Sequence, residues 1–202
     1  MTLTHFVRAL ALSLAFASVS VAAKAEPREY RVDPEHFHIV FSADHLGFGD
    51  VIGMFLSGQA SFVYDEETNR LISASATIDA DSVFTNVDAR DRHLRSGDFL
   101  DAGNHPAIQF VARSATALGE NRGRVTGDLT IRGVTRSIPL DVELTGAGDY
   151  PFPTTGPEPN NVLGVRLTTS FLRSDFGMSY AVENGWVGDE VDVIIAFEAI
   201  RQ

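Results

Sequence analysis

Apolar and polar residues alternate with a period of two along most of the chain beyond residue 26, which is typical of strands with one buried face. In the run 39–44, for example, Ile39, Phe41 and Ala43 fall on one face. The run 191–200 is apolar on both faces, so it is predicted to be a central or covered strand. The pattern predicts eight or nine antiparallel strands, drawn from 28–33, 39–44, 60–64, 72–78, 107–117, 125–131, 138–144, 162–170 and 191–200.

Short polar connections separate these strands. Residues 65–69 and 118–121 are predicted to be turns, and Arg132-Gly133 is predicted to be a tight hairpin connection in which Gly133 adopts a positive φ. Residues 146–161 are rich in glycine and proline and predict a long external loop. Too little chain follows this loop for a second domain.

Many short antiparallel strands joined by turns predict an all-β domain, either a sandwich or a closed barrel. Several inward positions carry small residues, and a barrel of about eight strands with room inside can enclose one ligand. Small residues that alternate with large ones also serve to fit the taper of a filled barrel, so both interpretations stay open. The small inward residues are Ala43, Ala60, Ala74, Ala76 and Gly127.

A charged insert, residues 84–101, interrupts the strands. Within it, 87–96 predicts one short helix that Asp88 caps, with arginines toward its C-terminal end, where cations suit the helix dipole. A helix this short cannot stand alone in water. It must therefore dock on the barrel, and Leu94 and Phe99 are the expected anchors.

The first 25 residues have the features of a secretory signal peptide: Arg8 near the start, an apolar run at 9–23 and the A-x-A cleavage site Ala23-Lys24-Ala25. A membrane anchor is the alternative, but the run of about 15 residues is shorter than the ~20 that span a bilayer. Cleavage after Ala25 would leave 26–202 as one periplasmic domain.

Composition narrows the classes of function. The net charge of −11 argues against nucleic acid and anionic membrane surfaces as partners. The chain has no cysteine, which excludes disulfides, thiol catalysis and thiolate metal sites. No later apolar stretch predicts stable insertion in a membrane, and the sequence carries no G-x-S-x-G elbow, phosphate loop or dinucleotide fingerprint.

Five stretches, in the right order and spread over nearly all of 26–202, resemble the YceI family of exported, lipocalin-like proteins that bind polyisoprenoids and other lipids. Phe37 and Met54 depart from the family pattern near the expected mouth or wall of the barrel. The stretches are Val32–His36 with Val40-Phe41, His45–Phe48 with Gly53–Phe55, Arg90–Arg95 with Asp98–Asp101 and His105–Phe110, Gly127–Thr135, and Arg173–Met178.

The resemblance implies an eight-stranded antiparallel barrel with a short helical insert and a long apolar tunnel. The expected ligand is an isoprenoid quinone, a polyprenyl chain or a fatty-acid derivative, held for transport or storage without a cofactor, and a homodimer is left open. Fourteen Phe and one Trp suit an apolar tail, although core packing explains any single Phe as well. The expected ligand-binding residues are Ile39, Phe41, His45, Phe62, Ala76, Ile78, Phe84, Arg90, Asp91, His93, Leu94, Phe99, Phe110, Leu129, Ile131 and Phe176.

The cluster Asp88, Arg90, Asp91 and His93 allows three interpretations. It binds a ligand headgroup at the tunnel mouth, or it forms salt bridges that pin the helix to the barrel rim. In the third, Asp91 and His93 serve a lipid-modifying stress enzyme, although no aligned nucleophile is evident. A module whose groove binds a protein segment is a further alternative for the whole chain.

Two other histidine positions bear on function. His36 and His38 lie two apart in a predicted strand, so they share a face and could bind zinc, but no carboxylate pattern nearby supports a metal site. His45 falls on the same face as Phe41 and Ala43. It is either a polar group inside the cavity or a hydrogen-bonded core residue.

Overall fold

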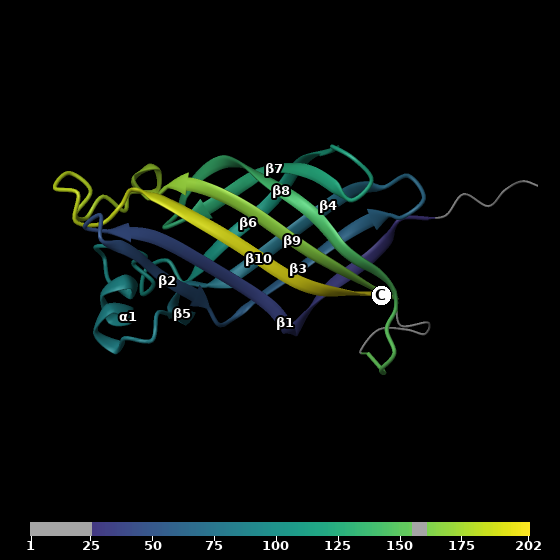
Figure 1. Cartoon of the computed structure of the whole chain (residues 1–202), viewed down its shortest axis with the longest axis horizontal. Coiled ribbons are helices and arrows are strands. Elements are labelled where there is room, and N and C mark those ends of the chain that lie inside the picture. Colours follow the sequence, from purple (N-terminus) through teal and green to yellow (C-terminus); the bar gives the residue numbers. More distant parts are fainter. Residues whose placement is uncertain (1–25, 155–160) are drawn as a thin grey trace, which may run out of the picture.

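In the computed structural model, which describes residues 26–154 and 161–202, the strands form one closed antiparallel barrel (Figure 1). The strand order is β10-β9-β8-β7-β6-β4-β3-β1-β2-β5, and β10 also pairs with β1 to close the barrel. This confirms the predicted all-β barrel and excludes the sandwich. The strands are β1 (Arg28–His45), β2 (Gly49–Phe55), β3 (Gly58–Asp65), β4 (Arg70–Asp79), β5 (Val83–Phe84), β6 (Ala107–Ala117), β7 (Arg122–Ile131), β8 (Val134–Asp149), β9 (Asn161–Leu172) and β10 (Glu190–Arg201).

Two sides of the barrel are each built from two successive strands. β3 pairs with residues 28–31 of β1 and β2 with residues 39–45, so the two strands lie one after the other along the same side of β1. In the same way β4 pairs with β3, and the short β5 pairs with β2. The ten strands therefore make an eight-stranded barrel, as the resemblance implied.

The strand pattern differs from the predicted one in three places. The runs 28–33 and 39–44 are parts of a single strand, β1, whose register against β10 shifts between Val32 and Phe37. β2 and β5 were not predicted, since β2 holds two glycines in seven residues and β5 has only two residues. β10 has a neighbour on each side, but its outward Ile194 is 40% exposed, so the strand is not covered.

The connections are mostly those that the sequence predicts. Arg132 and Gly133 both have positive φ, 51° and 72°, and form a two-residue turn between β7 and β8. The predicted loop 146–161 begins later than expected, because β8 continues to Asp149 and pairs with β9. Residues 155–160 of that loop and the predicted signal peptide, 1–25, lie outside the described residues.

The charged insert forms α1 (Asp88–Arg95) at one end of the barrel, beside the short β5 (Figure 1). The predicted helix is therefore present. The predicted cap is wrong: Val87 occupies the N-cap position without a side-chain bond, and Asp88 lies in the first turn, where its charge suits the helix dipole. Two short 3₁₀ helices, η1 (Ala80–Ser82) and η2 (Arg173–Phe176), lie at the ends of β4 and β9.

Within the described residues, no helix is both long enough and apolar enough to cross a membrane.

Candidate functional site

The barrel encloses a cavity of about 580 Å³ with almost entirely apolar walls. Alternate residues of each strand point inward, as a period of two requires. On β1 and β10, for example, these inward residues form two parallel rows along the cavity. The rows are Phe37, Ile39, Phe41 and Ala43 on β1, and Val191, Val193, Ile195 and Phe197 on β10.

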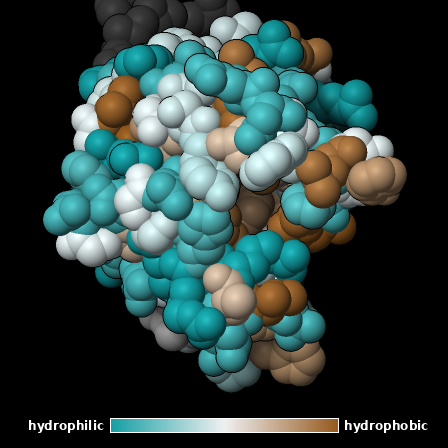
Figure 2. Space-filling view, turned by 90° about the vertical axis from the view of Figure 1, so that its left-hand side faces the viewer, coloured by the Kyte–Doolittle hydropathy of each residue, from teal (hydrophilic) through white to brown (hydrophobic). Residues whose placement is uncertain are grey.

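The cavity opens at the end of the barrel that carries α1. Three apolar residues line the cavity and are also exposed, so they form its rim: Leu46 is 44% exposed, Tyr180 43% and Trp186 56%. Figure 2 shows this end of the molecule, where apolar residues surround a hollow in a mostly hydrophilic surface. A ligand would therefore enter past α1 and the segment that joins β9 to β10.

A second cavity, of about 170 Å³, continues toward the opposite end of the barrel. The two cavities share six wall residues, so they are two parts of one tunnel with a constriction between them. Small residues keep space there, whereas the rings of Phe110 and Phe197 narrow it. The shared residues are Ala60, Ala76, Phe110, Leu140, Leu167 and Phe197.

Gly127 has a different role from the alanines. A Cβ atom at Gly127 would lie 2.3 Å from Cζ of Phe110, so the glycine lets this ring lie flat on the wall. Ala43, Ala60 and Ala76 line the cavity instead. The small residues of the sequence thus serve both purposes that were left open: space inside the barrel and close packing of large rings.

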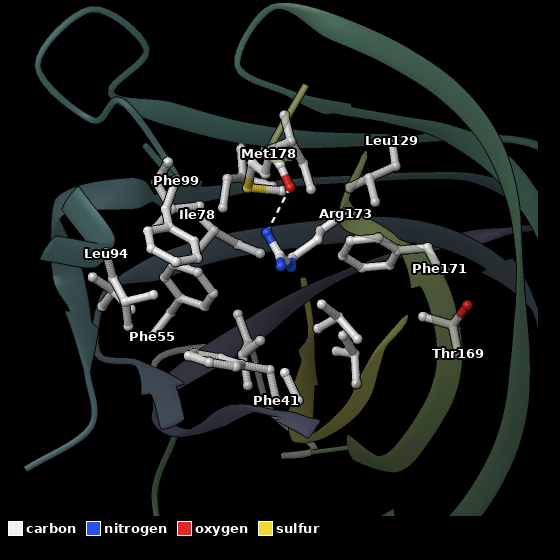
Figure 3. A pocket seen from close by; sticks show the side chains of 18 of the residues that line it. Phe41, Phe55, Ile78, Leu94, Phe99, Leu129, Thr169, Phe171, Arg173 and Met178 are labelled. Atoms are coloured by element: carbon white, nitrogen blue, oxygen red, sulfur yellow. Dashed lines mark hydrogen bonds between the residues drawn. The ribbon is translucent and has the colours of Figure 1, made fainter. Parts of the chain in front are cut away.

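Arg173 is a buried cation at the mouth, only 3% exposed. Its Nε donates to Gly188 O at 2.8 Å and its Nη1 to Met178 O at 2.6 Å, while Nη2 donates to Tyr180 O and Val187 O, both at 2.9 Å. The guanidinium points into the cavity among Phe99, Phe171 and Met178 (Figure 3). Desolvation by burial lowers the pKa of Arg173, although the nearby Asp189 acts in the opposite direction.

Sequence reasoning missed Arg173 as a site residue. The residue stands in one of the five stretches that resemble the family, but only Phe176 was selected there. The available signal was a charged residue at the end of an apolar strand, followed by the turn at Gly177, whose φ is 79°. Burial of an arginine at such a place needs many partners, and the segment 178–188 supplies them as backbone carbonyls.

Most of the predicted ligand-binding residues lie on the wall of the main cavity, and whether they bind a ligand stays a prediction. Phe62 lies on the wall of the second cavity instead. The main-cavity residues are Ile39, Phe41, His45, Ala76, Ile78, Arg90, His93, Leu94, Phe99, Phe110, Leu129 and Ile131.

Three predicted residues do not reach either cavity. Phe84 is 37% exposed, because its neighbour Val83 takes the inward position of β5. Phe176 is 1% exposed and packs edge-on against Phe171, with 5.2 Å between ring centroids, so it belongs to the core behind the wall. Asp91 is 4% exposed and faces the backbone of the insert.

The polar residues of α1 bind the free edge of β5 and its neighbours. Asp91 Oδ1 accepts from Thr85 N at 2.8 Å and Thr85 Oγ1 at 2.5 Å. Arg90 donates to Thr85 Oγ1 at 2.7 Å and Thr85 O at 2.9 Å, and Arg95 donates to Asp81 O at 2.6 Å and Val83 O at 2.8 Å. β5 has no further strand on this side, and these bonds replace some of the hydrogen bonds that such a strand would make. The insert is thus pinned to the rim by side-chain hydrogen bonds, most of them to backbone groups, and by an ion pair between Arg95 and Asp81 at 3.5 Å, which lies outside the cluster.

His93 belongs to the mouth rather than to this edge. Its Nε2 lies 2.9 Å from Oδ2 of Asp98, and its ring packs edge-on against Phe99 and Tyr180, at 5.0 Å from each. Asp91 and His93 therefore have separate partners and do not form an acid–base pair. The polar groups at the cavity wall near the mouth are His45, Arg90, His93 and Arg173.

Fold and site together define a class: a closed antiparallel barrel with an apolar tunnel, open beside a helical insert. The model of the YceI-like domain matches residues 30–199. A UPF0312 protein of Pectobacterium carotovorum is 34% identical over 190 residues, which cover 93% of this chain and 94% of that protein. The chain belongs to the YceI family.

Solved structures show the same barrel. The Campylobacter jejuni YceI protein matches with a TM-score of 0.70 and 28% identity, over 79% of this chain and 90% of that one. A polyisoprenoid binding domain from Saccharophagus degradans, implicated in plant cell wall breakdown, matches with a TM-score of 0.61 and 14% identity. That match covers 88% of this chain and all of that domain. At 14% identity it shows that the two proteins share a fold.

Proposed function

We propose that this protein binds one long-chain amphiphile, with the apolar tail in the tunnel and the polar headgroup at the mouth. The cavity is the main support: about 580 Å³ enclosed by apolar side chains, with polar groups gathered at its open end. Removing apolar surface from water contributes ~25 cal/mol per Å². These walls therefore favour an alkyl or prenyl chain, and the polyisoprenoid-binding relative of the same fold is consistent with this.

The headgroup in this proposal carries oxygen acceptors, as a quinone, a polyprenyl headgroup or a fatty-acid derivative does. Arginine has five N–H donors, and the four bonds of Arg173 to carbonyls leave one for a ligand. Arg90 and His93 add donors at the same end of the cavity. A ligand oxygen near Arg173 would also offset the cost of burying its charge.

We further propose that the protein is exported, loses residues 1–25 and carries or stores its ligand in the periplasm without a cofactor. The apolar run and the A-x-A site support export. Binding is favoured over catalysis because the carboxylate of Asp91 is used by Thr85, while His93 pairs with Asp98. Neither residue is poised to activate a nucleophile or a water for the other.

A variant with a large side chain at the constriction tests whether the ligand tail lies in the tunnel. Ala76 lies on the wall of both cavities, so Ala76→Trp should lower the affinity for a fluorescent long-chain fatty acid at least tenfold. A tenfold loss corresponds to about 1.4 kcal/mol. Ser73→Trp is the matched control, because Ser73 is exposed on the same strand and lines neither cavity.

Fluorescence titration measures the affinity, and circular dichroism checks that both variants keep the barrel. Binding to the Ala76→Trp protein with the affinity of the unmodified protein would show that the tail does not occupy the tunnel.

A further inference from the structure

A bulge in β1 brings together three side chains that are apart in the predicted strand pattern. Val32 pairs with Ala199 of β10 and Phe37 pairs with Phe197, so the four residues 33–36 lie opposite the single residue Glu198. Three of these four residues are exposed, and Glu35 N donates to Asp33 Oδ1 at 3.0 Å within the bulge. The bulge thus places Asp33 and His36 beside Glu198.

These three residues present one ligand atom each to a common point. His36 Nδ1 lies 2.8 Å from Oδ2 of Asp33 and 3.7 Å from Oε2 of Glu198. The three ligand atoms all lie within 4.8 Å of one another. Because the imidazole is 46% exposed and Glu198 35%, an ion in solution can reach them.

The cluster holds two carboxylates and a single histidine as their ion-pair partner. In the described part of the chain, the ion pairs of Asp33 and Glu198 are with His36 alone, and no lysine or arginine pairs with either carboxylate. A third acid, Glu35, also acts on His36. The charge of Glu198 also reaches Tyr150, where it is the main reason that the pKa of this phenol is raised.

We propose that Asp33, His36 and Glu198 bind a divalent metal ion, with zinc as the best match. One imidazole and two carboxylates are ligands that zinc accepts, at about 2.0–2.2 Å each. Tetrahedral ligand atoms at such distances lie about 3.4 Å apart, and the observed 2.8 Å and 3.7 Å lie on either side of this value. Water would fill the fourth position. Asp33 Oδ1 accepts from the backbone of Glu35, and Asp33 Oδ2 is hydrogen-bonded to His36 Nδ1 at 2.8 Å, so the ion would displace the proton between these two atoms.

The site lies on the seam that closes the barrel. Asp33 and His36 belong to β1 and Glu198 to β10, and the pairing of these two strands completes the ring. An ion that binds only the native arrangement stabilises it by mass action. Zinc should therefore raise the melting temperature, and this effect is independent of any ligand in the tunnel.

Calorimetric titration of the untagged protein with zinc chloride tests the site. We expect one zinc ion per chain, an affinity at least tenfold lower in His36→Asn, and an unchanged affinity in His38→Asn. His38 is the matched control because it is an exposed histidine two residues further along the same strand. Zinc should raise the melting temperature of the unmodified protein and of His38→Asn, but not of His36→Asn.

Equal zinc affinity in the unmodified protein and His36→Asn would overturn the proposal, as would an equal loss in His38→Asn. Glu198→Gln provides the same comparison if His36→Asn does not fold by circular dichroism. It keeps the size of the side chain and removes only its charge, so unchanged zinc binding in Glu198→Gln would likewise count against the site.

Discussion

At the scale of single residues, Arg173 joins the parts of the molecule that border the mouth. Its guanidinium binds four carbonyls of the segment 178–188 and lies 5.5 Å from the centre of the Phe99 ring. The neighbouring Ser174 is held as well, since its N and Oγ donate to Asp189 at 2.9 Å and 2.7 Å. One side chain thus fixes the shape of the opening through which a ligand would pass.

Arg173→Met should lower the free energy of unfolding by about 2–4 kcal/mol, because several buried carbonyls lose a charged donor. Arg173→Lys should recover only part of the loss, since an ammonium cannot reproduce the planar fork. The control is Arg136→Met: Arg136 is exposed and donates only to Thr135 O, so the change should stay within about 0.5 kcal/mol. Urea unfolding measures all three, and equal losses in Arg173→Met and Arg136→Met would contradict this role.

The direction of most side chains could be predicted at this scale, because a period of two assigns each residue of a regular strand to one face. This is why Ile39, Phe41 and Ile78 lie on the cavity wall as expected. The rule gives no answer outside regular strands. Phe84 lies in a strand of only two residues, where the period of two gives no reliable direction. Asp91 was predicted to bind a ligand because it is charged, but its carboxylate accepts two hydrogen bonds from Thr85 inside the protein.

At the scale of elements, α1 completes a sheet edge that β5 leaves open. The carbonyls of Asp81, Val83 and Thr85 accept from Arg95 and Arg90, and Thr85 N donates to Asp91. An open edge at this place would leave backbone groups without partners next to the cavity. The charges of the insert are therefore needed for its docking, before any contact with a ligand.

Asp91→Ala should lower the free energy of unfolding by about 2–3 kcal/mol, because Thr85 N and Oγ1 lose their acceptor inside the protein. Asp88→Ala on the same helix is the matched control. Asp88 is exposed in the first turn, so its loss should cost only about 0.3–1 kcal/mol.

Hydrogen exchange should locate the difference: residues 83–95 lose protection in Asp91→Ala while the strands keep theirs. Equal losses in the two variants would show that α1 does not depend on this buried carboxylate.

The elements themselves were partly predictable. Long alternating runs predicted most strands, and the composition of 87–96 predicted α1. The bulge in β1 was not predictable, because nothing in the local sequence states that Glu198, more than 160 positions away, lies opposite 33–36. For the same reason His36 was compared with His38, its neighbour in sequence, and not with the carboxylates that the fold brings beside it.

At the scale of the whole molecule, the barrel encloses a tunnel with a constriction between its two cavities. The main cavity begins at the rim formed by Leu46, Tyr180 and Trp186, and the second cavity continues beyond Phe110 and Phe197. A long tail would pass the two rings and reach the second cavity, whereas a short one would end before them. The motifs of the sequence implied the barrel and its apolar interior, but the division of the tunnel depends on rings from β6 and β10 that meet only in the fold.

Mass spectrometry of an organic extract, made from the protein purified in its native form, tests the proposed function most directly. The tunnel predicts one class of long-chain amphiphile, present at close to one molecule per chain. The same species should be retained by Ser73→Trp and depleted in Ala76→Trp. An extract without such a species, or equal amounts in Ala76→Trp and the unmodified protein, would contradict the proposal that the tunnel holds a lipid.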